Sequence, residues 1–277
     1  MGQGGLTLGM RLIASDIDGT ILGHDGKISD RTVEAFAAAA EAGVEIVFVT
    51  GRPPRWLEPI REQIGHSGMV ICSNGAVSYD LAAEKVTESH VLDWETVMAV
   101  RGIITALTPE PYFALESLLG FHVEEGFLSA RTAASGTYYP SPLAPEMAKG
   151  GIVKMLSVVH SGTADEFLNL VSPSLSSLIA VTHSAPDLAM LEMGPLGVNK
   201  AVTLAKYAAS KGIDAADVVA FGDMPNDIEM LAWAGAGYAM ASGHPDALAA
   251  AALRAPRFES DGVAQVIESR LAALRLS

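Results

Sequence analysis

Two aspartates stand two positions apart in the segment Asp16-Ile17-Asp18-Gly19-Thr20, directly after an apolar run that is typical of a buried strand. Carboxylates at the end of such a strand are costly unless a cation or hydrogen bonds compensate their charge. Beside a divalent metal ion, one of them can attack phosphorus while the other protonates the leaving oxygen. Gly19 permits a tight turn whose N–H groups could help to hold a phosphate. An ordinary Asp-Gly turn with a second surface carboxylate would also explain the pentapeptide.

Two further polar segments could serve the same chemistry. Thr50-Gly51-Arg52 follows the mostly apolar run Val44 to Val49, and its hydroxyl and N–H groups could hold a phosphate oxygen or simply begin a helix. Lys200 precedes the helical run Ala201 to Ala209. An amine next to Asp16 would neutralise carboxylate and phosphate together, although a lysine at a helix start is commonly a solvated surface residue.

A fourth polar segment, Gly222-Asp223-Met224-Pro225-Asn226-Asp227, again follows an apolar run. Asp223 is placed to complete an oxygen-rich Mg2+ site with Asp16, and Asn226 or Asp227 could bind the ion or support the residues that do. A helix start capped by an aspartate or asparagine is the ordinary alternative.

Strand-like and helix-like segments alternate on both sides of these clusters, which predicts a parallel sheet with right-handed crossovers. In such α/β sheets, ligands bind beyond the carboxyl ends of the strands. The four clusters fall at the predicted ends of strands or at the starts of helices. The expected strands are 11–15, 44–49, 69–72, 218–221 and 237–240, and the expected helices are 29–43, 53–64, 201–209, 226–234 and 261–274.

The pattern changes between about residue 84 and residue 190, where Pro-rich and Ser-rich breaks separate the strand candidates 121–125, 154–160 and 188–193. A chain of 277 residues is long enough for two domains. We therefore expect a Rossmann-like α/β core from residues 1–84 and 191–277, with residues 85–190 inserted as an α+β cap.

In this chain order the four clusters resemble those of the haloacid dehalogenase-like phosphohydrolases, specifically the Cof-type branch with a large α/β cap inserted after the second motif. Ser73-Asn74-Gly75-Ala76 and Asp261-Gly262-Val263-Ala264 are supporting matches. The resemblance implies that Asp16 is the nucleophile, that Asp18 is the acid/base, and that the backbone carbonyl of Asp18 contributes to a Mg2+ site.

The resemblance also implies that Thr50 and Lys200 contact the phosphate and that Asp223 binds the metal. It therefore predicts a catalytic set of Asp16, Asp18 and Lys200, a substrate-binding set of Thr50, Gly51, Arg52, Asn74 and Asn226, and a metal-binding set of Asp16, Asp18, Asp223 and Asp227.

The cap of such enzymes is expected to close over the phosphate and to choose the leaving group. Each candidate for contact with the substrate could equally be a core or a solvated side chain. These candidates are Arg131, Tyr138, Tyr139, Lys154 and His183.

The composition of the chain limits the kinds of binding partner and the cellular location that we expect. A net charge of −14 without a basic stripe argues against nucleic acid, and no apolar run approaches the roughly 20 residues of a membrane span. The single cysteine, Cys72, forbids an intrachain disulfide, and the N-terminal residues lack the basic region of a signal peptide. We expect a soluble cytoplasmic protein, as a monomer or a homodimer.

The expected activity is Mg2+-dependent hydrolysis of a small phosphate monoester, with sugar phosphates as the leading class and phosphorylated cofactors such as pyridoxal phosphate or flavin mononucleotide next. Two alternatives remain open: a phosphotransferase or mutase that hands the phosphoryl group to another hydroxyl, and a regulator that binds a phosphorylated ligand without turnover. Dehalogenation would leave Asp18 and the acidic cluster without a role.

Overall fold

The computed structural model describes residues 9–23, 25–65, 68–127, 140–185 and 188–274. Contacts divide the chain into two compact units. The core unit comprises the residues up to Thr87 together with those from Lys200 onward, and the cap unit comprises Glu88–Asn199. Each unit is described by itself.

The core unit contains an eight-stranded sheet in the order β13-β12-β11-β1-β2-β3-β4-β5. Its central strands are parallel, and β4 turns back antiparallel to β3. The strands are β1 (Leu12–Ser15), β2 (Glu45–Val49), β3 (Met69–Cys72), β4 (Val77–Asp80), β5 (Lys85–Ser89), β11 (Val218–Gly222), β12 (Ala236–Met240) and β13 (Leu253–Ala255). The carboxyl ends of β1, β2, β3 and β11 therefore share one edge of the sheet.

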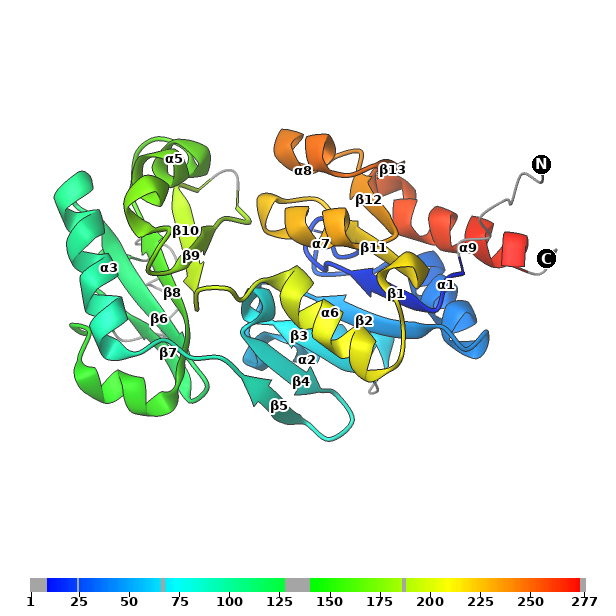
Figure 1. Cartoon of the computed structure of the whole chain (residues 1–277), viewed down its shortest axis with the longest axis horizontal. Coiled ribbons are helices and arrows are strands. Elements are labelled where there is room, and N and C mark those ends of the chain that lie inside the picture. Colours follow the sequence, from blue (N-terminus) through cyan, green and yellow to red (C-terminus); the bar gives the residue numbers. More distant parts are fainter. Residues whose placement is uncertain (1–8, 24, 66–67, 128–139, 186–187, 275–277) are drawn as a thin grey trace. The chain divides into compact units, whose positions relative to one another are not determined.

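Helices cover both faces of the core sheet, which is why its central strands are almost wholly apolar. On one face, Leu12 and Ala14 of β1 pack in a buried cluster with residues of α6 and α7, such as Leu204 and Met230. On the other face, α1 lies beside α9 (Figure 1), and Phe36 packs edge-on against Phe48 of β2. The core helices are α1 (Asp30–Glu41), α2 (Glu58–Ile64), α6 (Lys200–Ser210), α7 (Ile228–Trp233), α8 (Pro245–Ala250) and α9 (Gly262–Leu274).

The helix expected over residues 53–64 is divided in the structure. A 3-10 turn, Pro54–Trp56, comes first, and α2 begins only at Glu58. Pro59 explains the break, because a proline in a helix interior removes one hydrogen bond and clashes with the preceding turn, whereas in the first turn it is tolerated. The other short 3-10 turns are η2 (Ser73–Gly75), η3 (Pro145–Gly150), η4 (Ala215–Asp217), η5 (Pro225–Asp227) and η6 (Phe258–Ser260).

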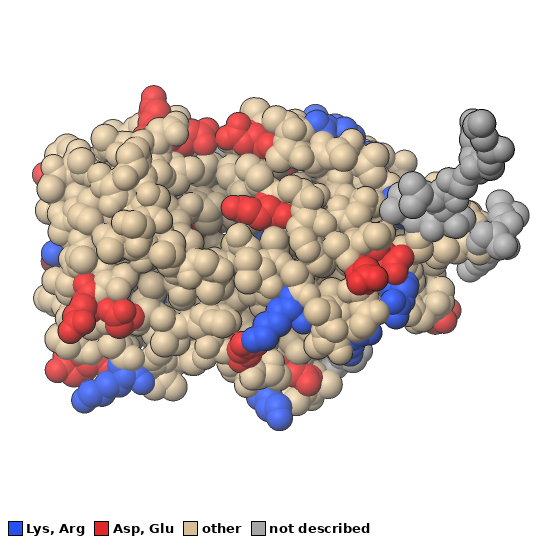
Figure 2. All heavy atoms as spheres, viewed as in Figure 1, with Lys and Arg blue, Asp and Glu red and all other residues tan. Residues whose placement is uncertain are grey.

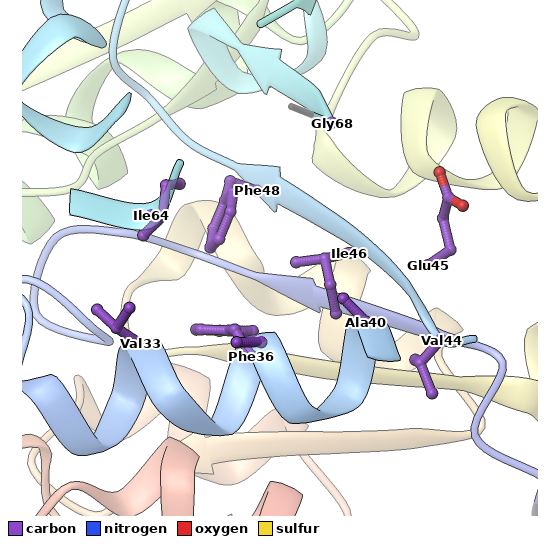
Figure 3. A pocket seen from close by; sticks show the side chains of 10 residues that line it. Val33, Phe36, Ala40, Val44, Glu45, Ile46, Phe48, Ile64 and Gly68 are labelled. Carbon is purple, nitrogen blue, oxygen red and sulfur yellow. The ribbon is translucent and has the colours of Figure 1, made fainter. Parts of the chain in front are cut away.

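A pocket of about 280 Å3, lined by apolar side chains and by Glu45, lies between α1, β2 and the end of α2 (Figure 3). Phe36, Ala40, Ile46, Phe48 and Ile64 contribute to its wall. None of the expected site residues lines this pocket, so it belongs to the packing of the helical layer and not to the edge where the polar clusters lie.

The cap unit is an antiparallel sheet in the order β7-β6-β8-β10-β9, and among its described residues the helices α3 and α5 pack on one face. Thr163 caps α5, because its hydroxyl accepts the N–H of Glu166 while the Glu166 carboxylate accepts the N–H of Thr163. The elements are β6 (Tyr112–Ser117), β7 (Gly120–Val123), β8 (Ile152–Val158), β9 (Ala180–Thr182), β10 (Met190–Gly194), α3 (Trp94–Leu107) and α5 (Ala164–Leu175). The expected fold class, an α/β core with an α+β insertion, is confirmed.

The unit boundaries lie further along the chain than the sequence suggested. The expected cap was 85–190, whereas the compact cap unit spans Glu88–Asn199. Two strands account for the difference: β5 (Lys85–Ser89) extends the core sheet, and β10 (Met190–Gly194) pairs with β8 and β9 of the cap.

Among the described residues, no helix combines the length and the apolar character needed to cross a membrane. On the face shown in Figure 2, basic side chains stand in small separate groups with acidic side chains among them. On that face, the net charge of −14 is therefore not offset by a continuous basic surface.

Candidate active site

Asp16 lies at the carboxyl end of β1, where its backbone N–H donates to the carbonyl of Phe221 at 2.9 Å and ties the segment to β11. The following residues fold back at once, because the carbonyl of Ile17 accepts N–H groups from Thr20, Ile21 and Leu22. Asp16 itself is buried. The chain thus delivers a desolvated carboxylate to the edge of the sheet, as the apolar strand followed by aspartate predicted.

Gly19 shows why this loop requires glycine. Its φ of +77° is in the left-handed region, and a Cβ at this position would stand 2.4 Å from Oδ2 of Asp223. Thr20 donates its hydroxyl to Oδ1 of the same carboxylate at 3.1 Å. The loop after β1 is therefore packed directly against the loop after β11, although the two are about two hundred residues apart in the chain.

Lys200 is the first residue of α6, and its side chain is only 1% exposed. Its Nζ lies 2.6 Å from Oδ1 of Asp16 and 2.6 Å from Oδ1 of Asp227. The hydroxyl of Thr203, one helical turn later, donates to the carbonyl of Gly75 and anchors the start of α6 at this edge. The structure therefore rejects the alternative of a solvated surface lysine.

Asp227 supports the loop that carries Asp223. Its Oδ2 accepts the N–H groups of Asp223 and Met224, each at 3.0 Å, and its Oδ1 accepts from Lys200. Both carboxylate oxygens of Asp227 thus already take hydrogen bonds within the protein. Carboxylate oxygens of Asp16, Asp223 and Asp227 all lie within 4.8 Å of one another.

The cluster holds three neighbouring carboxylates, those of Asp16, Asp223 and Asp227, in a largely buried space. Burial and mutual repulsion both disfavour their charged forms. Burial raises the pKa of Asp16 well above its ordinary value, and Asp227 and Asp223 add to the rise while Lys200 opposes it. Burial, together with the neighbouring Asp227, raises the pKa of Asp223 to about 7. Burial acts to lower the pKa of Lys200, but Asp16 and Asp227 outweigh it and hold the amine in its charged form.

A divalent cation fits this environment. Of the three neighbouring carboxylates, those of Asp16 and Asp227 pair with the ammonium of Lys200. Hard oxygen donors are the ligands that Mg2+ prefers. Asp16 and Asp223 are the residues best suited to hold the ion, with Asp227 holding both Lys200 and the Asp223 loop. The carboxylate of Asp18 is not a member of the cluster. Its expected part in metal binding therefore falls to its backbone carbonyl, and this stays a prediction.

Asp18 forms a two-pronged ion pair with Arg52. The Arg52 Nε donates to Oδ2 at 2.7 Å and Nη2 donates to Oδ1 at 2.6 Å. The side chain of Asp18 is 55% exposed, in contrast to buried Asp16. We expected Arg52 to contact substrate, whereas here it holds the acid/base candidate. The contact between Arg52 and Asp18 could have been predicted from the adjacency of β1 and β2 in a parallel sheet, because this adjacency places the loops that follow the two strands side by side.

Thr50 is fully buried, and its hydroxyl accepts the N–H of Arg52 at 3.1 Å. Asn74 and Asn226 lie together, since Nδ2 of Asn226 donates to Oδ1 of Asn74 at 3.0 Å. Sequence reasoning placed Gly51 and these residues in the substrate-binding set without foreseeing the contact between the two asparagines. All of them lie on loops at the edge that carries Asp16.

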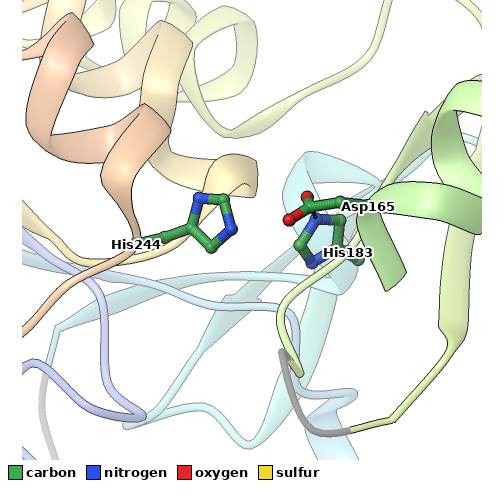
Figure 4. A group of neighbouring side chains, drawn as sticks. All are labelled: Asp165, His183 and His244. Atoms are coloured by element: carbon green, nitrogen blue, oxygen red, sulfur yellow. Dashed lines mark hydrogen bonds and ion pairs between the residues drawn. The ribbon is translucent and has the colours of Figure 1, made fainter. Parts of the chain in front are cut away.

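The cap candidates differ from their expected surroundings. Lys154 is buried on β8 and pairs with Oε2 of Glu192 at 2.5 Å, while Ser184 donates to the other oxygen of Glu192. His183 is buried, and its Nε2 lies 2.8 Å from Oδ1 of Asp165 (Figure 4). The solvated-surface alternatives for Lys154 and His183 are therefore wrong. Arg131, Tyr138 and Tyr139 lie outside the described residues.

The chain matches the model of the haloacid dehalogenase-like hydrolases over residues 13–267 and belongs to that family. It is 30% identical over 245 residues to the HMP-PP phosphatase of Yersinia pseudotuberculosis serotype I (strain IP32953), a match that covers 85% of each protein. The family expected from the four motifs is thus confirmed, and the chain is a hydrolase.

Solved structures support the same fold. BT1666 from Bacteroides thetaiotaomicron, described among the phosphatases of this superfamily, aligns with a TM-score of 0.79 at 22% identity, covering 98% of this chain and 97% of that one. The subclass IIB sugar phosphatase BT4131 aligns with a TM-score of 0.78 at 22% identity, covering 94% and 98%. Because these matches span nearly the whole chain, they include the inserted cap as well as the core.

Proposed function

We propose that this hydrolase is a Mg2+-dependent phosphatase that cleaves small phosphate monoesters through an aspartyl-phosphate on Asp16. The observation that carries the proposal is the placement of Lys200 between Asp16 and Asp227, with Asp223 beside them. A buried amine at this point can hold a phosphate oxygen and keep the attacking carboxylate ionised.

In the first step, one carboxylate oxygen of Asp16 attacks phosphorus in line with the ester oxygen. The bond from phosphorus to the leaving oxygen breaks, and that oxygen takes a proton from Asp18. In the second step, water attacks phosphorus and gives its proton to Asp18. The acyl phosphate bond breaks, inorganic phosphate leaves, and both carboxyl groups return to their starting states.

The ion pair of Asp18 with Arg52 fits the second step better than the first. Two charge-assisted hydrogen bonds stabilise the carboxylate form of Asp18, which is the form that accepts a proton from water. Donation to the leaving oxygen requires the protonated form, so Arg52 must release at least one oxygen of Asp18 during the cycle. We propose that the substrate takes up the freed guanidinium, in keeping with the expected substrate-binding role of Arg52.

The proposed cofactor is Mg2+, with Asp16 and Asp223 as side-chain ligands, the carbonyl of Asp18 as a backbone ligand and Asp227 as their support. When bound, such an ion neutralises charge on the phosphate oxygens and orients them for in-line attack. Thr50, Gly51 and Asn226 are proposed to contact the phosphate from the neighbouring loops.

The proposed substrates are small phosphorylated metabolites, with sugar phosphates first and phosphorylated cofactors second. The name of the Yersinia relative adds HMP-PP to the compounds worth testing, and BT4131 is described as a sugar phosphatase. Nucleic acid is not proposed as a partner, given the net charge of −14. A reducing cytoplasm suits a chain whose single cysteine is buried on β3.

The test is release of inorganic phosphate from a panel of phosphorylated metabolites and a chromogenic phosphate ester, with and without Mg2+. We expect turnover only with the metal, and we expect Asp16→Asn to abolish it while leaving the unfolding transition in place. Undiminished turnover by Asp16→Asn would remove the mechanism. Isomeric sugar phosphate in place of inorganic phosphate would indicate the mutase alternative, and ligand binding without turnover would indicate a regulator.

A further inference from the structure

The turn after β3 has a backbone conformation that its residue types rarely adopt. Ser73, Asn74 and Gly75 have φ values of 50°, 56° and 103°, three left-handed residues in succession. Only glycine enters this region freely, and asparagine tolerates it better than most other residues. Such strain persists only where surrounding contacts hold it, and it is concentrated at functional sites.

The backbone of this turn holds the loop after β2. The N–H of Ser73 donates to the carbonyl of Arg52 at 3.0 Å, and the N–H of Asn74 donates to the carbonyl of Thr50 at 3.1 Å. The left-handed conformation lets two successive N–H groups reach the same loop. The turn therefore fixes the backbone of Thr50 and Arg52 through these two hydrogen bonds. Thr50 is the residue proposed to contact phosphate, and Arg52 is the residue that binds Asp18.

The other contacts of the turn reach two more loops of the site. Oδ1 of Asn74 accepts from Nδ2 of Asn226, a buried residue next to Asp227. The carbonyl of Gly75 accepts from Thr203, one turn after Lys200 on α6. Through Asn74 and its neighbours, the loop after β2, the start of α6 and the loop after β11 are all tied to a single short turn.

Asn74 meets two requirements that few residues meet together. It tolerates the left-handed backbone that aims its N–H at Thr50, and it carries an acceptor that holds Asn226. Glycine would satisfy only the first requirement, and alanine would satisfy neither. A turn that merely connected β3 to β4 would need the backbone conformation but not the carboxamide.

We propose that Asn74 is a positioning residue, which sets the phosphate-binding loop at Thr50 and the carboxamide of Asn226 in the relative placement that reaction at Asp16 requires. The inference rests on the proposed phosphatase function. It replaces the expectation that Asn74 itself binds substrate: Asn74 acts through Asn226 and Thr50.

Two variants separate the two parts of this role. Asn74→Gly keeps the left-handed backbone and removes only the carboxamide, whereas Asn74→Ala strains the backbone as well. The matched control is Glu110→Ala, which replaces another left-handed residue, with a φ of 50°, on an exposed turn of the cap unit. Each protein is measured for kcat, KM and the thermal unfolding midpoint. Hydrogen exchange is measured in peptides that cover Thr50–Arg52 and Asp223–Asp227.

We expect Asn74→Gly to lower kcat/KM about tenfold, mostly through kcat, which corresponds to the loss of one well-placed hydrogen bond. Asn74→Ala should lower it about a hundredfold, as expected when a catalytic group is misplaced by roughly an ångström. Exchange should quicken in both loops and stay unchanged in α1. Glu110→Ala should lower only the unfolding midpoint.

Wild-type kcat/KM in Asn74→Gly overturns the inference, whatever the exchange data show. A loss of activity that follows only the folded fraction overturns it too, because Asn74 would then be a purely structural residue. If the unmodified protein hydrolyses no phosphate ester, the proposed function fails separately. Hydrogen exchange then decides whether Asn74 holds the two loops: faster exchange in the variants supports the placement, and unchanged exchange rejects it.

Discussion

At the scale of single residues, the site is organised by one buried amine. Lys200 is 1% exposed and lies 2.6 Å from a carboxylate oxygen on each of two loops. Two buried carboxylates without a counter-charge would repel each other and lose their hydration. Lys200 therefore has a structural role beside its proposed chemical one, and the two can be measured separately.

Replacing Lys200 by methionine tests both roles. Because removal of one partner from a buried ion pair leaves an uncompensated charge, we expect unfolding free energy to fall by about 3–5 kcal/mol. Turnover should fall at least about a hundredfold, since the phosphate loses its cation. The control is Lys211→Met, whose side chain is 46% exposed beside Glu45; there we expect a cost of at most about 1 kcal/mol and normal turnover. Urea unfolding measures the change in unfolding free energy, and steady-state kinetics measures the change in turnover. Equal effects of Lys200→Met and Lys211→Met would contradict both roles of Lys200.

The pairing of Arg52 with Asp18 can be tested by Arg52→Lys, which keeps the charge but loses the two-pronged geometry. We expect kcat/KM to fall about tenfold or more, because a single ammonium cannot hold both oxygens of Asp18. Arg31→Lys is a matched control: Arg31 pairs in the same two-pronged way with Glu268, between α1 and α9. Steady-state kinetics should find Arg31→Lys unaffected. A similar loss in both variants would assign the effect to stability and not to Asp18.

At the scale of elements, tight turns determine which loops can approach one another. Gly19→Ala would place a Cβ 2.4 Å from Oδ2 of Asp223 at a φ of +77°. Gly26 has nearly the same φ, +74°, but nothing within 4 Å of its Cβ position. The two glycines differ mainly in whether an added Cβ would collide with a carboxylate. Substitutions at Gly19 and Gly26 can therefore be compared directly.

We expect Gly19→Ala and Gly26→Ala to share a backbone cost of about 1–2 kcal/mol in unfolding free energy. Only Gly19→Ala should displace Asp223 and raise the Mg2+ concentration that gives half-maximal activity, by about tenfold or more. A Mg2+ titration of activity, with urea unfolding in parallel, measures both effects. An unchanged Mg2+ requirement in Gly19→Ala would show that Asp223 does not hold the metal.

The first helix of the cap unit offers a test of stability against pH. Asp93 caps α3, accepting the N–H of Thr96 at 2.7 Å and its hydroxyl at 2.9 Å. These hydrogen bonds, the backbone one first, lower the pKa of Asp93. A depressed carboxyl pKa contributes stability that is present above the unfolded value of about 3.9 and is lost as pH falls through the folded value.

Asp93→Ala should therefore cost about 1 kcal/mol of unfolding free energy at pH 7, a typical value for an exposed cap. The difference from the unmodified protein should shrink as the pH falls below about 4. Asp93→Ser, which can still cap the helix, should recover most of the loss at pH 7. Urea unfolding at a series of pH values makes the comparison, and a difference that does not vary with pH would argue that the charge plays no part.

At the scale of the whole molecule, the acidic cluster predicts that a bound cation stabilises the core unit. Any ligand that binds only the folded state raises its stability, by about 2.7 kcal/mol at a concentration of 100 times Kd. Here the bound ion would also relieve repulsion between Asp16 and Asp223. Stability and activity should accordingly respond to the same metal.

We expect Mg2+ to raise the thermal unfolding midpoint, and Na+ at the same ionic strength to leave it nearly unchanged. Asp223→Asn should lose most of the Mg2+ effect, because the ion loses a charged ligand. Scanning calorimetry of both proteins, with and without a chelator, measures the shift. A full Mg2+ effect in Asp223→Asn would place the metal somewhere else.

The class of fold and the grouping of Asp16, Asp223 and Lys200 could be predicted from the amino-acid pattern. Strand-ending aspartates and the alternation of strands and helices are local patterns, so Asp16, Asp223 and Lys200 could be assigned to one edge from hydrophobic periodicity and the family motifs. The break before α2 was missed because the effect of Pro59 depends on where the preceding turn begins. The predicted ends of the cap differ from those of the compact cap unit because the sheets that β5 and β10 join depend on strands remote in the chain.

The partner of each side chain became known only from the folded structure. Arg52 binds Asp18 from the neighbouring strand, Lys154 is buried against Glu192, and Asn74 accepts a hydrogen bond from Asn226 across 152 positions of sequence. Such contacts have no local signature, since a residue's type and spacing say which bonds it can form but not which partner the folded chain brings within 3 Å of it. For that reason the amino-acid pattern was sufficient to identify a candidate edge of the sheet, and the packing of loops along that edge was needed to propose a role for each residue within it.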